Sequence, residues 1–102
     1  MKESAIRRLA CDELERLGYI VWWPYDNRWA KEQDIFGVFD LIAIHKKTAL
    51  VQFVQITTVS NISARKKKVI GFLLKLRWQD DNFIFSVWGY NQKYKHFKQV
   101  QL

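Results

Sequence analysis

Hydrophobic and polar residues alternate along the first third of the chain in a way that predicts a helix followed by a strand. Apolar side chains recur at spacings of three and four over residues 3–17, which is typical of an amphipathic helix, and Gly18 stands where a helix C-terminal glycine belongs. Residues 19–23 then form a short predicted strand that Pro24 ends. Residues 24–35 are polar and irregular, and loops of this length in compact domains are often functional.

Two strongly apolar runs follow the loop, at residues 36–44 and 50–57, with a tight turn at Lys46 and Lys47 between them. Each run is apolar on both of its faces, as expected for central strands that helices cover on either side. If the two strands pair as a hairpin, residues near Asp40 lie opposite residues near Gln55.

The second half of the chain predicts one more helix and two more strands. Asn61 or Ser63 can cap a helix that runs to about Arg77. Strands are predicted at residues 83–90 and 94–100. The resulting order, α-β-β-β-α-β-β, predicts an α/β fold in which a mixed sheet packs against helices.

Length and composition indicate one domain. The chain has 102 residues, 49% of them hydrophobic, which is enough for a core. No run approaches the roughly 20 apolar residues of a membrane span, and no secretory signal opens the chain. We therefore expect a cytoplasmic protein, in a host cell if the protein is viral. The single cysteine, Cys11, excludes an intramolecular disulfide and a multi-cysteine zinc site, and we expect a buried thiol.

The net charge of +7 is unevenly distributed. Residues 1–60 hold as many acidic as basic side chains, whereas residues 61–102 hold nine basic and two acidic ones. A basic half favours a polyanionic partner, nucleic acid above all. The alternatives are an anionic membrane surface, or a solubilising face with no partner.

Six residues are the candidates for contact with nucleic acid. The basic run lies near the start of the second predicted helix, where positive charge is unfavourable by roughly a few tenths of a kcal/mol, so its position suggests a use. In the polar loop, a tryptophan flanked by basic residues could stack on an unpaired base, a contact worth ~1–3 kcal/mol. The candidates are Arg65, Lys66, Lys67 and Lys68 in the helix and Arg28 and Trp29 in the loop.

The strongest chemical signal is Asp40, a lone acid in an apolar run. Burying a carboxylate costs roughly several kcal/mol unless a metal ion, a basic partner or hydrogen-bond donors compensate it. Gln55 and Thr57 share one face of the next strand, and the hairpin would bring them to Asp40, with Asp34 approaching from the loop. Such an oxygen cluster suits Mg²⁺ and hydrolysis of a phosphodiester bond. The alternative is structural: hydrogen bonds to backbone donors for Asp40, sheet-edge hydrogen bonds for Gln55 and Thr57, and an ordinary loop acid in Asp34.

Four segments in this order resemble the PD-(D/E)XK phosphodiesterase superfamily, and Holliday-junction-resolvase-like and small phage-type nucleases most of all. The segments are the helix ending at Leu17-Gly18-Tyr19 and residues 36–44, 54–57 and 61–65. The resemblance implies a restriction-endonuclease-like fold, with a mixed five-stranded sheet flanked by two helices. It also implies an endonuclease that depends on Mg²⁺ or Mn²⁺.

The resemblance further implies roles for individual residues. Asp40 matches the metal-binding acid of the first motif, and Gln55-Ile56-Thr57 matches the second motif, in which glutamine can replace the acid. Thr57 departs from the pattern, which has a lysine there, so Lys68 or Lys66 would have to reach back from the helix. Glu3 or Glu13 could supply the first-helix acid of resolvases. The expected catalytic set is Asp40, Gln55, Thr57 and Lys68, and the expected metal ligands are Asp40, Gln55 and Asp34.

Three functions are compatible with these features. The leading one is a metal-dependent DNA endonuclease that acts on junction or structured DNA as a symmetric homodimer, with neither a membrane partner nor a small-molecule cofactor. The second is a catalytically inactive nucleic-acid-binding module on the same fold, which Thr57 favours. The third is an interaction protein whose exposed aromatic residues dock another protein, which leaves Asp40 unexplained.

Overall fold

The computed structural model describes residues 2–24, 34–76 and 81–102. Within these ranges the elements follow the order α-β-β-β-α-β-β, as expected, with one short 3₁₀ turn added. Their bounds are α1 (Glu3–Arg16), β1 (Tyr19–Trp22), β2 (Leu41–His45), β3 (Val51–Thr58), the 3₁₀ turn η1 (Val59–Asn61), α2 (Ile62–Leu73), β4 (Phe83–Asn91) and β5 (His96–Gln101).

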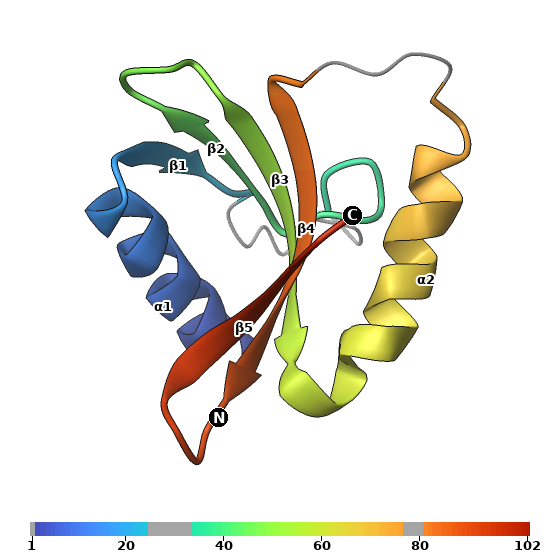
Figure 1. Ribbon diagram of the computed structural model, residues 1–102. Coiled ribbons are helices and arrows are strands. Elements are labelled where there is room, and N and C mark those ends of the chain that lie inside the picture. The colour runs from blue at the N-terminus through green and yellow to red at the C-terminus, as the bar shows by residue number, and fades with distance from the viewer. Residues whose placement is uncertain (1, 25–33, 77–80) are drawn as a thin grey trace.

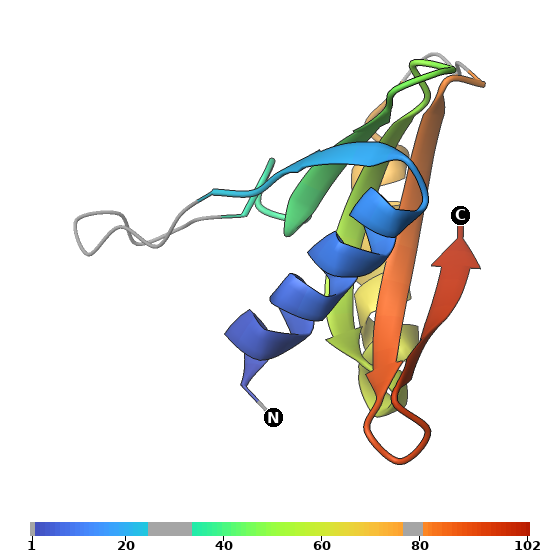
Figure 2. The same ribbon diagram turned by 90° about the vertical axis from the view of Figure 1, so that its left-hand side faces the viewer.

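The five strands form one mixed sheet in the order β1-β2-β3-β4-β5. The neighbouring strands are antiparallel except for β3 and β4, which are parallel. A parallel pair needs a crossover, and α2 provides it. Helices α1 and α2 lie on opposite sides of the sheet, so the molecule has three layers (Figures 1 and 2). The predicted α/β class with a mixed five-stranded sheet and two helices is confirmed.

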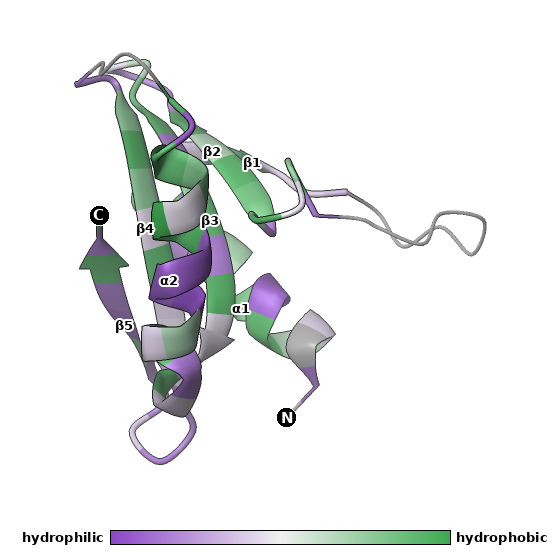
Figure 3. Cartoon of the chain, turned by 90° about the vertical axis from the view of Figure 1, so that its right-hand side faces the viewer, coloured by the Kyte–Doolittle hydropathy of each residue, from purple (hydrophilic) through white to green (hydrophobic). Residues whose placement is uncertain are grey.

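Each face of the sheet has its own core. On the α1 face, Ile6, Ala10 and Leu14 of the helix pack with Leu41, Val54, Ile56 and Trp88 of the strands. On the α2 face, Phe39, Ile62, Val69 and Val87 form a second cluster with several partly buried phenylalanines around it. The hydrophilic middle of α2 crosses the largely apolar strands β3 and β4 (Figure 3). Neither helix of the described chain is long and apolar enough to cross a bilayer.

Among the predicted element bounds, the start of the second strand differs most from the structure: β2 begins at Leu41 and not at Phe36. Residues 35–39 form a turn, in which Ile35 and Phe39 exchange backbone hydrogen bonds of 2.7 and 2.9 Å. Phe36 and Gly37 adopt positive φ angles of 56° and 69°. Since the turn satisfies its own backbone groups, the apolar run does not need to extend as a strand.

The second helix and the last strand are also shorter than predicted. The helix α2 ends at Leu73, before a further turn in which Leu76 N donates to Leu73 O at 3.1 Å; Arg77 lies outside the described residues. The strand β5 begins at His96 and not at Tyr94, because the Asn91 side chain accepts the backbone N–H groups of residues 93 and 94 and holds them in a turn.

The expected side-chain cap of α2 is absent. Asn61 occupies the N-cap position but makes no capping hydrogen bond, and its Nδ2 donates to Thr58 Oγ1 at 3.2 Å. Ser63 lies within the helix. The close packing of α2 depends on Gly89 of β4, where a Cβ atom would approach Ile62 Cδ1 to 2.5 Å. Because Gly89 pairs with Thr57, α2 begins directly over the end of β3.

Candidate functional site

Asp40 lies at the point where β2 begins and β3 continues past it. The register of the two strands ends with Leu41 opposite Val54, and the Asp40 N–H donates to Val54 O at 2.8 Å. The strand β3 continues to Thr58, past the point where Leu41 begins β2. The prediction that Asp40 lies inside a strand is therefore wrong. Asp40 directly precedes β2 and lies beside the open edge of β3.

The Asp40 carboxylate accepts hydrogen bonds along that open edge. Asp40 is 8% exposed, and its Oδ2 accepts from Ile56 N at 2.7 Å and from Gln55 Nε2 at 2.8 Å. Donors aimed at a buried carboxylate offset the loss of its hydration. The prediction that Asp40 and Gln55 lie together is confirmed. These hydrogen-bond donors also compensate the buried charge of Asp40, as the structural alternative predicts.

Gln55 brings an oxygen atom without a partner to the same place. The residue is 2% exposed, and its Nε2 donates both to Asp40 Oδ2 and to Ile56 O at 3.1 Å, which fixes the orientation of the amide. Its Oε1 is buried and has no hydrogen-bond partner among the described residues. An unsatisfied buried acceptor costs about 1–3 kcal/mol, so it calls for a ligand or a structural explanation. Amide and carboxylate oxygens are both ligands that a hard cation accepts.

Thr57 lies two residues beyond Gln55 on β3 and shares its face of the sheet. It is 7% exposed and pairs with Gly89, so it is enclosed where α2 meets the sheet. A threonine hydroxyl can form a hydrogen bond there but cannot carry a positive charge.

Lys68 and Asp34 contact each other. Lys68 Nζ lies 3.8 Å from Asp34 Oδ2, and the two side chains are 37% and 41% exposed, as in an ordinary surface ion pair. This contact ties α2 to the turn at residues 35–39, since Lys68 precedes Phe72 by one helical turn and the Phe72 ring stacks on Phe36. The contact that the structure gives Lys68 is thus with Asp34, and its reach to the Asp40 site stays a prediction.

The remaining nucleic-acid candidates lie along α2 or outside the described chain. Arg65 and Lys66 are half-buried at the side of the helix, and Lys67 and Lys68 are exposed. Arg28 and Trp29 lie outside the described residues.

Glu13, one of the two candidate first-helix acids, lies on the far side of the sheet from Gln55. It is part of α1, where it binds Arg16 through contacts of 3.1 and 2.5 Å. The hydrogen bond from Arg16 lowers the pKa of Glu13. Glu3 opens the same helix.

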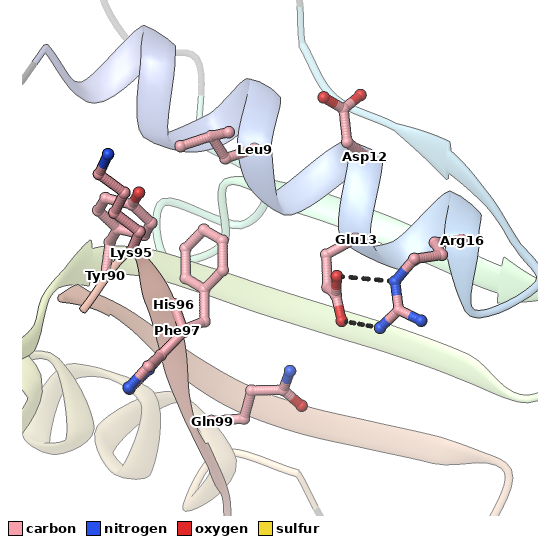
Figure 4. A pocket seen from close by; sticks show the side chains of 9 residues that line it. All are labelled: Leu9, Asp12, Glu13, Arg16, Tyr90, Lys95, His96, Phe97 and Gln99. Carbon is pink, nitrogen blue, oxygen red and sulfur yellow. Dashed lines mark hydrogen bonds and ion pairs between the residues drawn. The ribbon is translucent and has the colours of Figure 1, made fainter. Parts of the chain in front are cut away.

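A cleft of about 360 Å³ separates α1 from β5, and the Glu13–Arg16 pair forms part of its wall (Figure 4). Its polar side chains do not converge. His96 lies on the side of β5 opposite to Phe97, and Asp12 points away from Glu13. The described residues of this cleft form no metal-binding cluster.

Sequence reasoning missed two features of the α2 face: the unpartnered Gln55 Oε1 and the turn that places Phe36 in front of α2. The described residues contain no group of three or more His, Cys, Asp or Glu side chains arranged to hold a metal. A cation beside Asp40 and Gln55 would therefore take most of its ligands from water and substrate, as Mg²⁺ commonly does. None of the family models, curated proteins and solved structures compared with this chain matches it.

Proposed function

We propose that this protein is a Mg²⁺-dependent DNA endonuclease of the PD-(D/E)XK type with a restriction-endonuclease-like fold, acting on junction or structured DNA. The observation that carries the proposal is the buried, unpartnered Oε1 of Gln55, a residue whose amide nitrogen donates to the carboxylate of Asp40. The element order and the mixed sheet between two helices support the same assignment.

Asp40 and Gln55 would hold the ion, which can also be Mn²⁺, through one carboxylate and one amide oxygen. Magnesium characteristically binds one or two carboxylates and keeps several waters, so this small donor set fits. When bound, the ion supplies a water of lowered pKa and neutralises charge on the scissile phosphate. Asp34 is the third ligand of the proposed set, and its Oδ2 lies 3.8 Å from Lys68 Nζ.

The basic side chains of α2 would bind the DNA backbone. Lys67 and Lys68 are exposed, with Arg65 and Lys66 beside them. Phosphate contacts give affinity and register without reading the sequence, and their strength falls steeply as salt is raised. Thr57 holds the place of the family lysine and supplies a hydroxyl there, so the positive charge for the reaction must come from α2.

A symmetric dimer belongs to the same proposal, because one domain of this size covers few phosphates. The edge strand β1 offers a surface for a second copy, since Ile20 and Trp22 on it and Ile44 beside it are 61%, 54% and 46% exposed. We expect light scattering to give the mass of a dimer, and Trp22→Lys to give that of a monomer. A monomeric wild type would contradict this part of the proposal.

Cleavage of supercoiled plasmid tests the endonuclease. We expect wild type to nick the plasmid with Mg²⁺ or Mn²⁺, and Asp40→Asn to lose nicking while it keeps its gel shift with DNA, because the asparagine oxygen can still accept from Ile56 N. Asp81→Asn, a change at an exposed acid, is the matched control and should cut normally. Calorimetry should show uptake of Mg²⁺ or Mn²⁺ by wild type only. No metal uptake, together with unaltered behaviour of Asp40→Asn, would contradict the proposal.

The second candidate is a DNA-binding module without catalysis. Thr57 in the lysine position favours it, as does the engagement of Lys68 by Asp34. A salt-dependent gel shift with no cutting in either metal would support this function over the first.

A further inference from the structure

A groove opens on the α2 face of the sheet, and the described residues that line it all have apolar side chains. It has a volume of about 290 Å³. Its walls are rings packed on one another: Phe53 stacks on Phe85 at 5.1 Å and 14°, and Phe36 stacks on Phe72 at 5.5 Å and 22°. We call this the aromatic groove, and its lining residues are Phe36, Phe53, Phe72, Leu76, Phe83 and Phe85.

Phe36 stands at the mouth of the aromatic groove in an unusual conformation. Its φ is 56°, a left-handed value that a bulky side chain rarely adopts, and the residue is 68% exposed. Strained residues of this kind occur preferentially at ligand-binding positions. The result is an exposed aromatic ring, one side of which rests on Phe72.

The aromatic groove adjoins the Asp40–Gln55 site. Phe53 precedes Gln55 by two residues on the same face of β3, a separation of about 7 Å along a strand. Phe39, which directly precedes Asp40, contacts Phe53, Phe72 and Phe85 at ring distances of 5.5, 5.3 and 5.7 Å. A base in the groove would thus lie close enough to the Asp40–Gln55 site for a phosphate of the same strand to reach that site.

Two cationic side chains border the groove. Lys75 is exposed and directly precedes the lining residue Leu76, and Lys68 lies one helical turn before Phe72, where it also pairs with Asp34. Aromatic faces beside cationic side chains are the combination by which proteins bind single-stranded nucleic acid, whose bases stack while its phosphates pair with lysine. An apolar peptide would match the groove but not its cationic border.

We propose that the aromatic groove binds an unpaired nucleobase of the DNA strand whose phosphates lie along α2. The base stacks on Phe36 and leaves its hydrogen-bonding edge in water. Since none of the described lining residues has a polar side chain to read that edge, recognition is independent of sequence. The inference rests on the proposed function and names its substrate class: DNA with unpaired bases beside the cut.

Binding by fluorescence anisotropy tests the groove with three DNAs: a matched duplex, the same duplex with one unpaired base, and one with an abasic nucleotide in its place. We expect wild type to bind the unpaired base roughly tenfold more tightly than the other two, in line with one stacked base. Phe36→Gly should lose this preference and keep its duplex affinity, because glycine adopts a positive φ readily. Tyr94→Ala removes an aromatic side chain that is 64% exposed in the β4–β5 turn, and should keep both.

The outcomes separate the two proposals. Equal affinity of wild type for abasic and unpaired-base DNA, or an unchanged preference in Phe36→Gly, would overturn the groove proposal whether or not the protein cuts. A preference that depends on Phe36 in a protein that cuts nothing would support the groove and reject the endonuclease. Asp40→Asn should keep the base preference while losing cleavage.

Discussion

The two faces of the sheet are built differently. On the α1 face the helix residues Ala10 and Leu14 are fully buried against strand residues that are themselves fully buried, and the polar Gln52 there accepts from Ser86 Oγ at 3.0 Å. On the α2 face a buried acceptor of Gln55 has no partner, and Phe36 stands in solvent at a strained φ. Each face therefore holds one buried polar atom without a partner among the described residues, Trp88 Nε1 on the α1 face and Gln55 Oε1 on the α2 face. Only on the α2 face does that residue also contact a buried carboxylate, and only there does a strained, exposed ring stand nearby.

Leu14→Ala tests the α1 face with the largest expected effect. Leu14 is 0% exposed, so the change leaves a cavity and should lower the free energy of unfolding by about 2–5 kcal/mol. Leu74→Ala, at a position that is 81% exposed, is the matched control and should have little effect. Urea denaturation measures both. Similar losses in the two variants would contradict the burial of Leu14 in the core on the α1 face.

The thiol of Cys11 gives the α1 face a pH signature. Burial, followed by the nearby charges of Glu15 and Asp12, raises its pKa from 9.0 to about 11. The folded state therefore holds this proton more tightly than the unfolded chain does. The resulting stability is complete below pH 9 and is lost as the pH rises from 9 to 11, by about 2–3 kcal/mol. The free energy of unfolding, measured at several pH values across this range, should depend less on pH for Cys11→Ala than for wild type. The same dependence in both proteins would argue against a buried thiol.

Gln55→Glu tests the α2 face. The change replaces the amide that donates to Asp40 with a second carboxylate, so repulsion should lower the free energy of unfolding by about 1–3 kcal/mol at neutral pH. Added Mg²⁺ should restore more stability than it gives wild type, because the two carboxylates share the ion. Gln52→Glu buries an acid on the α1 face and should be destabilised without responding to Mg²⁺. An equal response of both variants would contradict a cation site at Gln55.

Arg16→Ala should have the smallest effect. Its hydrogen bond lowers the pKa of Glu13, which means that any stability from the pair is present at neutral pH and lost as the solution is acidified. Exposed pairs of this kind contribute little, so the urea midpoint should stay within experimental error. A clear shift would mean that the α1–β5 cleft contributes to the core.

Local geometry explains what the sequence predicted well. Alternation along β3 places Phe53, Gln55 and Thr57 on one face whatever the fold, and a short turn pairs the flanking strands, which brings Asp40 to Gln55. The start of β2 was mispredicted because an apolar run suits a partly buried turn as well as a strand. The aromatic groove and the contact between Gln52 and Ser86 depend on segments far apart in the chain, so no local pattern contains them.

The parallel pairing of β3 with β4 has a consequence for biosynthesis. The meander of β1, β2 and β3 can form from neighbouring segments, but one edge of β3 lacks its partner until α2 and then β4 have left the ribosome. During that interval a nascent chain exposes an apolar, unpaired strand, a form that is prone to aggregate. We expect chaperone binding to concentrate on nascent chains of which residues up to 60–80 have emerged from the ribosome, and to decline once β4 has also emerged.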